Sequence, residues 1–296
     1  WIGSLNGLYT YRLKDRKLSR FDSNRSGLSH NTIYSIIHTK DNQIYVGTYN
    51  GLCRYIPEHG KFKSIFLPVD RAISNLFVNS LLEDITRQCI WIGMEGYLFQ
   101  YIPATGKMNA IEVFHNNSIK SLALDGDGNL LAGTDNGLYV YKNDEEPLQH
   151  IIHDSRNIQS LTNNIVWNIF SDQEQNIWLG TDYGISLSRY NSALQFVPIS
   201  QITGTGDGNQ FYSLFRDSKG FYWFGGTNGL LRFIHPTGTR HEAAWYKMGD
   251  KTYPLSHNRI RHIYEDKEQQ LWIATDGSIN RYNYATQQFI HYNIID

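Results

Sequence analysis

The chain has few of the residues and patterns that mark several common classes of protein. Its two cysteines, Cys53 and Cys89, lie outside any C-x-x-C spacing, so neither a disulfide framework nor a zinc site is indicated. It has no run of about 18 apolar residues and no charged-then-apolar leader, so we expect the segment neither to enter a membrane nor to carry a secretion signal. Lys and Arg number 27 against 28 Asp and Glu. Because this balance creates no field that attracts phosphates, nucleic acid is not an expected partner.

What the sequence does contain is a repeat. A phrase close to W-x-G-T-x-x-G-L-x-x-Y returns with separations of 44, 46, 40, 47, 45 and 49 residues. The copies begin at Trp1, Tyr45, Trp91, Leu131, Trp178, Trp223 and Trp272. A period of roughly 40 to 50 residues is typical of the four-stranded blade of a propeller. The sequence therefore predicts an all-β, seven-bladed β-propeller of four-stranded antiparallel blades.

The sixth copy shows how one repeat divides into strands. Residues 210–216 predict a first strand, and a turn at 217–220 leads to a second strand at 221–225. The Asn228-Gly229 pair predicts a tight turn into a third strand at 230–234, and a fourth strand is expected around 242–247. We expect one domain over residues 1–296, with blades at about 1–27, 28–72, 73–113, 114–157, 158–205, 206–254 and 255–296.

Features that recur from blade to blade are interpreted as scaffold. The anchor tryptophans, Trp1 included, are expected in the core, and the glycine after each anchor predicts close packing between blades. In the turns at Asn50, Asn136 and Asn228, an Asn-Gly pair is expected to supply positive φ values. An asparagine fourteen residues before the anchor is expected to hydrogen-bond the backbone where the first strand begins. It occurs as Asn31, Asn117, Asn164, Asn209 and Asn258.

The first copy begins at Trp1 and contains nothing that would form its first strand. Residues 7–12 and 17–21 predict its third and fourth strands, so blade 1 lacks its innermost strand within this chain. In closed propellers, such a blade is commonly completed by a strand from the other end of the chain, which removes an exposed edge. We therefore expect the native polypeptide to continue beyond Trp1 or Asp296 as part of a longer protein.

The complete repeat reads N-x-I-x-x-I-x-x-D-x-x-G-x-x-W-x-G-T-x-x-G-L-x-x-Y, as residues 164–185 and 258–282 show. It resembles the two-component regulator propeller repeat, and the resemblance covers nearly the whole chain. This resemblance implies the periplasmic sensor region of a hybrid two-component receptor, which is anchored in the inner membrane and has a histidine kinase module elsewhere. It also implies an oligosaccharide ligand that controls polysaccharide-utilisation genes, an adjacent propeller or sandwich domain, and a homodimer. The segment itself is not expected to be an enzyme.

One position on each first strand, three residues after the recurrent asparagine, differs in residue type from repeat to repeat. Its side chains are aromatic, amide or cationic, whereas the neighbouring positions stay apolar or small. Aromatic faces stack on sugar rings, and Arg, Lys and Asn bind hydroxyls or carboxylates. Because first strands line the channel of a propeller, we interpret this set as a ligand mouth, and a water-filled polar channel is the plainer alternative. The set is Tyr34, Asn79, Lys120, Trp167, Tyr212 and Arg261.

Metal and cofactor chemistry have weaker support. His30 and His257 stand in near-identical Leu-Ser-His-Asn segments, which favours a shared turn role over metal ligation. Residues 125–129 resemble a calcium loop but lack its downstream glutamate, and they fall at a hairpin where Asp and Gly serve turns. We therefore predict no metal site and no cofactor.

Two further functions remain open beside ligand sensing. The propeller can hold a partner protein without binding a ligand of its own. It can also be a polysaccharide-degrading enzyme, such as a lyase that uses Tyr34, Arg261 and His262. Glycosidic hydrolysis needs paired carboxylates, however, and the first strands carry few, with Glu83 and Glu265 toward their far ends. No catalytic residue is therefore predicted.

Overall fold

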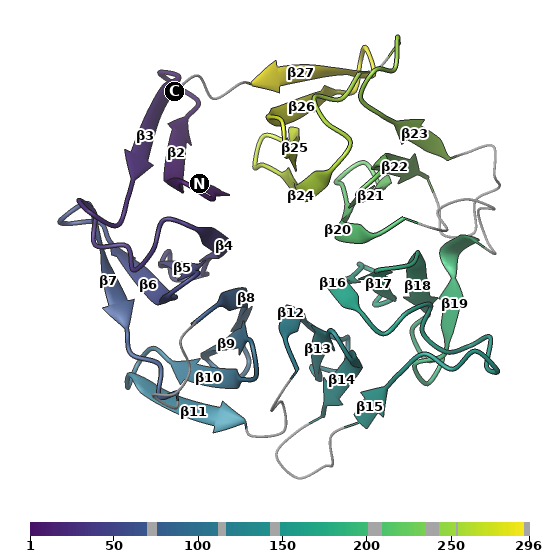
Figure 1. Ribbon diagram of the computed structural model, residues 1–296, viewed down its shortest axis with the longest axis horizontal. Coiled ribbons are helices and arrows are strands. Elements are labelled where there is room, and N and C mark those ends of the chain that lie inside the picture. Colours follow the sequence, from purple (N-terminus) through teal and green to yellow (C-terminus); the bar gives the residue numbers. More distant parts are fainter. Residues whose placement is uncertain are drawn as a thin grey trace. The chain divides into compact units, whose positions relative to one another are not determined.

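A computed structural model describes residues 1–69, 76–111, 117–142, 149–200, 209–234, 243–252 and 254–292. The chain divides into two compact units, Trp1–Leu122 (unit 1) and Ala123–Asp296 (unit 2). The described residues form seven antiparallel sheets, with three strands in the first sheet and four in each of the others (Figure 1). The fold class is therefore the all-β, seven-bladed β-propeller that the repeat predicts. The first blade lacks one strand, as expected.

Unit 1 contains the first three sheets. In each sheet the strands pair in chain order, because every strand is joined to the next by a short turn. The strands are β1 (Ile2–Ser4), β2 (Gly7–Arg12) and β3 (Lys17–Phe21) in the first sheet, β4 (Ile33–His38), β5 (Ile44–Thr48), β6 (Gly51–Ile56) and β7 (Lys61–Ile65) in the second, and β8 (Val78–Asp84), β9 (Cys89–Met94), β10 (Leu98–Ile102) and β11 (Lys107–Ile111) in the third. The boundary between the units falls within β12 (Ile119–Leu124).

The other strands belong to unit 2 and follow the same order. They are β13 (Leu130–Thr134), β14 (Gly137–Tyr141) and β15 (Gln149–Ile151), then β16 (Val166–Ser171), β17 (Ile177–Thr181), β18 (Ile185–Ser188) and β19 (Phe196–Pro198), then β20 (Phe211–Arg216), β21 (Tyr222–Gly226), β22 (Gly229–Phe233) and β23 (Ala244–Tyr246), and finally β24 (Ile260–Glu265), β25 (Leu271–Thr275), β26 (Ile279–Asn283) and β27 (Gln288–Tyr292). The sixth repeat thus divides as predicted to within a few residues, although position 242 lies outside the described residues.

The anchor tryptophans explain why an aspartate recurs in four of the turns between first and second strands. Trp91, Trp178 and Trp223 are fully buried, as predicted. A buried indole N–H needs an acceptor, and here a turn aspartate provides it. The donor-acceptor distances are 3.1 Å for Trp91 and Asp84, 2.8 Å for Trp178 and Asp172, 2.7 Å for Trp223 and Asp217, and 2.7 Å for Trp272 and Asp266.

Trp1 differs from the other anchors. Its ring stacks on Phe21 with centroids 5.6 Å apart and meets Tyr55 edge-on, yet 42% of the residue is exposed. The expectation that Trp1 is core is therefore wrong. It precedes β1, and its three-stranded sheet has no first strand to cover it.

The glycine two residues after six of the seven anchors allows successive sheets to approach closely, as predicted; the seventh copy has Ala274 at this position. A Cβ at this position would collide with the first residue of the next sheet's first strand. It would lie 2.8 Å from Ile33 at Gly3, 2.6 Å from Ile119 at Gly93 and 2.7 Å from Val166 at Gly133. Any larger side chain would therefore push two sheets apart. The hydrophobic cores lie between these faces, as where Trp178 packs with Phe211 and Phe224.

The turns between second and third strands correct one expectation. Gly51, Gly137 and Gly229 have φ values of 106°, 98° and 106°, but the asparagines before them do not adopt positive φ. The threonine two residues earlier explains the difference in the first two turns, because its hydroxyl accepts the N–H of Asn50 or Asn136. The glycine N–H in turn donates to the next sheet, at 2.9 Å from Gly51 to the Leu76 carbonyl. Glycine alone supplies the left-handed conformation.

The recurrent asparagine is a scaffold residue that ties one sheet to the next. Its side-chain oxygen accepts the N–H of a residue that has just left the preceding sheet. The distances are 2.7 Å for Asn31 and Ser23, 2.6 Å for Asn164 and His153, and 2.7 Å for Asn258 and Met248. Its predicted bonding to the backbone is therefore confirmed at these three sites.

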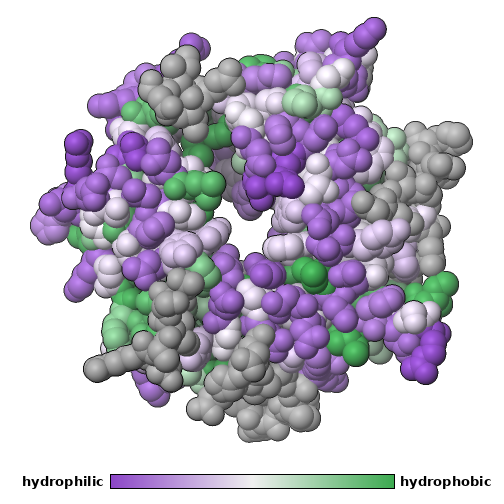
Figure 2. All heavy atoms as spheres, viewed as in Figure 1, coloured by the Kyte–Doolittle hydropathy of each residue, from purple (hydrophilic) through white to green (hydrophobic). Residues whose placement is uncertain are grey.

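On the face shown in Figure 2, hydrophilic residues predominate, and hydrophobic ones form small, separate areas. In the described ranges, no helix combines the length and apolarity needed to cross a membrane.

Candidate ligand-binding site

The non-repeating position on each first strand coincides with a break in strand pairing. In β16, Val166 pairs with Thr181 and Asn168 pairs with Gly180, so Trp167 is an extra residue opposite no partner. The same shift occurs in β4, β8, β20 and β24, and it isolates Tyr34, Asn79, Tyr212 and Arg261. Such a β-bulge redirects the side chain of the extra residue. Five of the six predicted site residues are therefore the extra residue of a β-bulge in a first strand.

In unit 2, three of these bulges lie side by side. Strand β20 contacts both β16 and β24, as Figure 1 also shows. The rings of Trp167 and Tyr212 meet edge to face, with centroids 5.3 Å apart and planes at 82°. The Arg261 guanidinium lies 6.0 Å from the centre of the Tyr212 ring. We call Trp167, Tyr212 and Arg261 the unit 2 row.

Hydrogen bonds fix the two aromatic rings of the row to one carboxylate. The Trp167 indole N–H donates to Asp182 at 2.9 Å, and the Gln210 amide donates to the same oxygen at 2.7 Å. The Tyr212 hydroxyl donates to the Gln210 carbonyl oxygen at 2.6 Å. Because Asp182 is a charged acceptor, these bonds are stronger than neutral ones. The rings are therefore held in place before any ligand arrives.

Sequence reasoning does not single out Gln210, although a signal for it exists. It follows the recurrent asparagine directly. The equivalent residues in the other repeats vary as much as the predicted site position, and they are Thr32, Phe77, Ser118, Ile165 and Arg259. The same test of non-repetition therefore identifies this second position.

The cationic end of the row is neutralised by an aspartate. Arg261 donates to both carboxylate oxygens of Asp276, and Arg259 lies 3.8 Å from the same group. Although burial acts to raise it, the hydrogen bond and charge of Arg261 hold the pKa of Asp276 below its usual range. Burial raises the pKa of Tyr212 against the opposing charges of the two arginines. With Asp182, the site holds two positive and two negative groups.

Solvent reaches the row from one side. Arg261 is exposed, and Trp167 and Tyr212 are half-buried. Tyr183, next to Asp182 in the turn before β18, adds an aromatic ring that is 56% exposed. Rings and hydrogen-bonding groups thus share one accessible surface.

The predicted residues of unit 1 are held differently. The Asn79 amide donates to the Ile119 carbonyl at 3.1 Å and toward the Ser118 hydroxyl at 3.4 Å. The Lys120 ammonium donates to the same hydroxyl at 2.9 Å. Asn79 and Lys120 therefore converge on Ser118, and their polar groups are already engaged.

Tyr34, the third predicted residue of unit 1, belongs to an aromatic cluster. It is 46% exposed and meets Phe77 edge to face, with centroids 6.0 Å apart. Phe77 in turn contacts Tyr49, whose ring lies 4.8 Å from that of His30. The structure thus places Tyr34 beside aromatic rings of the neighbouring loops.

The residues behind the metal alternative have structural roles. His30 and His257 each accept a backbone N–H two residues ahead at 3.0 Å, which confirms the shared turn role. The Asp125 carboxylate accepts the N–H groups of Asp127 and Asn129 within its own hairpin. Across the described residues, no group of three or more His, Cys, Asp or Glu side chains is placed to hold a metal ion.

The two glutamates of the first strands bind neighbouring turns. Glu83 accepts the Lys40 N–H at 3.0 Å, and Glu265 accepts the Ser218 N–H and hydroxyl at 2.9 Å. Each ties a first strand to the turn of the preceding sheet. Their geometry is therefore that of scaffold residues.

Comparison with known proteins agrees with this architecture. The model of the two-component regulator propeller matches residues 27–50, 160–183, 205–228 and 254–277. The chain is 26% identical to histidine kinase P4 of Formosa agariphila over 98% of its own length and 22% of that protein. It is thus much shorter than this relative.

Solved structures give a second comparison. Two crystal structures of the extracellular domain of BT4673 from B. thetaiotaomicron are 81% and 82% identical to the chain. One is described as a one-component system and the other as a hybrid two-component system; each has a TM-score of 0.64, with 100% of this chain and 40% of that one covered. Virginiamycin B lyase from Staphylococcus aureus, 13% identical with a TM-score of 0.65 over 89% of this chain and 85% of the lyase, shares the fold alone.

Seven sheets built on one motif, each with a tryptophan or substitute anchor, define a repeat propeller, and the predicted site position on its first strands varies from repeat to repeat. The chain contains the two-component regulator propeller repeat, which the family model matches at four of its seven copies.

Proposed function

We propose that this chain is the ligand-sensing extracytoplasmic propeller of a hybrid two-component receptor and that the unit 2 row binds an oligosaccharide. The observation that carries the binding proposal is the pair of half-buried rings, Trp167 and Tyr212, tied to one carboxylate beside Arg261. Rings fixed in advance stack on a sugar with little loss of side-chain entropy, and the adjacent charged groups bond its hydroxyls. We also propose that Tyr34, Asn79 and Lys120 contact the ligand and contribute less to its affinity than the unit 2 row.

The charge balance of the site narrows the class of ligand. Arg259 and Arg261 face Asp182 and Asp276, so the site carries no net charge. A sulfated or uronic sugar would have to displace Asp276 from Arg261, whereas a neutral sugar leaves this pair intact. We therefore infer a neutral oligosaccharide.

The rest of the proposal concerns the whole receptor. Its support is the high identity to extracellular domains described as parts of signalling systems. Residues 1–296 form one domain of a periplasmic region that continues into an adjacent propeller or sandwich domain, works as a homodimer and is anchored in the inner membrane. The kinase module lies elsewhere in that protein, and control of polysaccharide-utilisation genes is its output. A single calorimetric unfolding transition is the expected result for one domain.

A panel of defined neutral and charged oligosaccharides tests the binding proposal by thermal unfolding. At a hundredfold excess over Kd, a ligand stabilises the folded state by about 2.7 kcal/mol. We expect at least one neutral sugar to raise the melting temperature, and we expect Trp167→Ala to abolish the shift. Tyr190→Ala, which removes an exposed aromatic ring elsewhere in unit 2, is the control.

Two outcomes would decide against this function. If no sugar shifts the melting temperature while a partner protein binds, the chain is an interaction propeller without its own ligand. If a bound sugar is cleaved during incubation, as chromatography would show, the chain is a polysaccharide-degrading enzyme. We expect the sugar to be recovered intact.

A further inference from the structure

Strand β7 of unit 1 has an outer edge that is only half covered. It is the last strand of its sheet, so one side of its backbone faces away from β6. The Phe62 N–H on that side donates to the Ser26 carbonyl at 2.7 Å. Because alternate residues of a strand present their backbone groups to the same edge, Ser64 points its N–H and C=O the same way. In the described part of the chain, no backbone group pairs with them.

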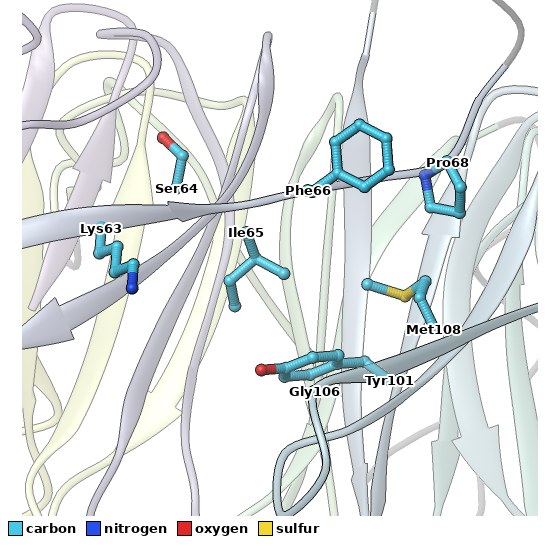
Figure 3. Close-up of a pocket in the computed structure, with 8 residues that line it drawn as sticks. All are labelled: Lys63, Ser64, Ile65, Phe66, Pro68, Tyr101, Gly106 and Met108. Carbon is cyan, nitrogen blue, oxygen red and sulfur yellow. The ribbon is translucent and has the colours of Figure 1, made fainter.

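A groove begins where this cover ends. Its volume is about 460 Å³, and it lies between the end of β7 with the residues after it and strands β10 and β11 of the third sheet (Figure 3). Figure 3 shows Met108 and Tyr101 across the space from Ile65 and Phe66. The lining includes Lys63, Ile65, Phe66, Pro68, Tyr101 and Met108. The walls are thus mainly apolar.

Phe66 stands out on this surface, since 83% of it is exposed. Burying a phenyl ring is favourable, so such exposure is informative beside a groove. The open strand edge, one wall of the groove and the exposed ring all lie within residues 63–68. They therefore form one surface, which we call the β7 groove.

Among the described residues of the two walls, every charged side chain is a lysine. Lys61 and Lys63 are exposed on β7, and the exposed Lys107 begins β11. Neither wall, residues 61–69 or 98–111, contains a carboxylate. An occupant that carries negative charge next to an apolar group would complement the groove.

We propose that the β7 groove binds an extended acidic peptide by strand addition. The peptide backbone pairs with the open edge at Ser64, an apolar side chain enters between Phe66 and Met108, and a neighbouring carboxylate meets Lys63. Strand addition takes its affinity from main-chain hydrogen bonds and its specificity from side-chain pockets. A sugar fits less well, because Lys63, Ser64 and the hydroxyl of Tyr101 supply all the polar side-chain groups among the described residues that line the groove.

Fluorescence anisotropy of a labelled peptide, Thr-Val-Glu-Leu-Thr-Glu-Val-Thr, tests the proposal with the whole 296-residue chain. We expect saturable binding that weakens at least about tenfold in Lys63→Glu and in Phe66→Ser, equivalent to about 1.4 kcal/mol. Both side chains are exposed, so the variants keep the native circular dichroism spectrum. Leu5→Ser, another exposed apolar residue of unit 1, is the control and leaves binding unchanged.

Further arms separate strand addition from other contacts. The same peptide with alternate backbone nitrogens methylated loses binding if its main chain pairs with β7, and replacing Glu with Lys in the peptide also abolishes binding. Equal binding of the methylated peptide, or no binding by any of these peptides, would refute the proposal. A dimer of the chain alone that Phe66→Ser dissociates in sedimentation would also overturn it, because the occupant would then be a second copy.

Discussion

Asn79 of unit 1 and the aromatic rings of unit 2 use one backbone device in opposite ways. A β-bulge isolates one residue on the first strand of a sheet in both units. In unit 1, the bulge residue Asn79 bonds to Ile119 and Ser118 of the adjacent sheet, so its polar group is used within the protein. In unit 2, Trp167 and Tyr212 are held by hydrogen bonds to Asp182 and Gln210, and both side chains remain partly exposed. The bulge sets the direction of the side chain. The neighbouring residues determine whether that side chain bonds within the protein or remains available to a ligand.

The turn aspartates show a second difference between the units. In unit 1, Asp84 bonds Trp91 and is held by Arg87 from its own turn, at 2.8 Å. In unit 2, Asp217 bonds Trp223 and receives the hydroxyl of Tyr284 from the next sheet, at 2.7 Å. The same scaffold carboxylate is therefore stabilised by a local cation in one unit and by a tyrosine of a neighbouring sheet in the other.

In each unit, two side-chain hydrogen bonds of the site converge on one acceptor, Asp182 in unit 2 and Ser118 in unit 1. Removing these acceptors should give the largest difference in sugar affinity between variants of the two units. Asp182→Ala deprives Trp167 and Gln210 of a charged acceptor, and each such bond contributes about 1.5–3 kcal/mol. We expect the affinity for the sugar selected by the panel to fall by about tenfold to a hundredfold in calorimetry. Ser118→Ala, which removes the shared acceptor of Asn79 and Lys120, should change affinity by less than about threefold. Equal losses would mean that the ligand contacts both units alike.

A smaller effect is expected from Gln210→Ala, because the bond from Trp167 to Asp182 survives. Tyr212 loses the acceptor of its hydroxyl, so affinity should fall by about threefold to tenfold, the effect of one neutral hydrogen bond. Fluorine NMR of 5-fluorotryptophan protein provides a readout without ligand. The Trp167 resonance, assigned with Trp167→Phe, should broaden as Tyr212 becomes mobile. Gln159→Ala, an exposed glutamine outside the row, should leave it sharp; an unchanged resonance in Gln210→Ala would show that Gln210 does not position the rings.

The turn aspartates should make the units respond differently to pH. Burial acts to raise the pKa of Asp84, but bonds from Arg87 and Trp91 hold it below its usual range. Its contribution to stability is therefore complete above pH about 4 and is lost as the pH falls below that value. Burial and the bond to Asp217 raise the pKa of Tyr284, so its contribution is present below pH about 10 and is lost as the pH rises.

Urea unfolding across this pH range measures both effects. The stability gap between wild type and Asp84→Asn should narrow in acid, and the gap for Tyr284→Phe should narrow in alkali. Tyr264→Phe, which alters an exposed tyrosine, is the control and should give a constant small gap. Gaps that do not depend on pH would show that these bonds do not link protonation to folding.

The repeat predicts what every sheet must share, and its predictions hold where packing is the same in each copy. The close approach of Gly133 to Val166, which leaves no room for a Cβ, and the burial of Trp223 illustrate this. Any sequence that keeps the period must satisfy those contacts. Trp1 departs from the rule because its sheet lacks the strand that would cover it. Periodicity is thus informative only where the complete neighbourhood of a residue recurs.

The positions of the candidate site residues could be predicted from the sequence, but the bulges and contacts that arrange their side chains could not. Variation at Trp167 and Tyr212 marks a side chain released from packing, yet the bulge that releases it depends on strand register, which composition does not encode. The bridge through Gln210 and the exposure of Phe66 depend on contacts between neighbouring segments of different sheets. These contacts vary from blade to blade, so the consensus repeat contains no record of them.

Titration calorimetry on two double variants compares the units as binding surfaces most directly. Trp167→Ala with Tyr212→Ala removes the rings of the unit 2 row, and Tyr34→Ala with Asn79→Ala removes two bulge residues of unit 1. We expect the first variant to give no heat with the selected sugar and the second to bind within about threefold of wild type. Wild-type affinity in the first variant, or loss of binding confined to the second, would contradict the assignment of the ligand to unit 2.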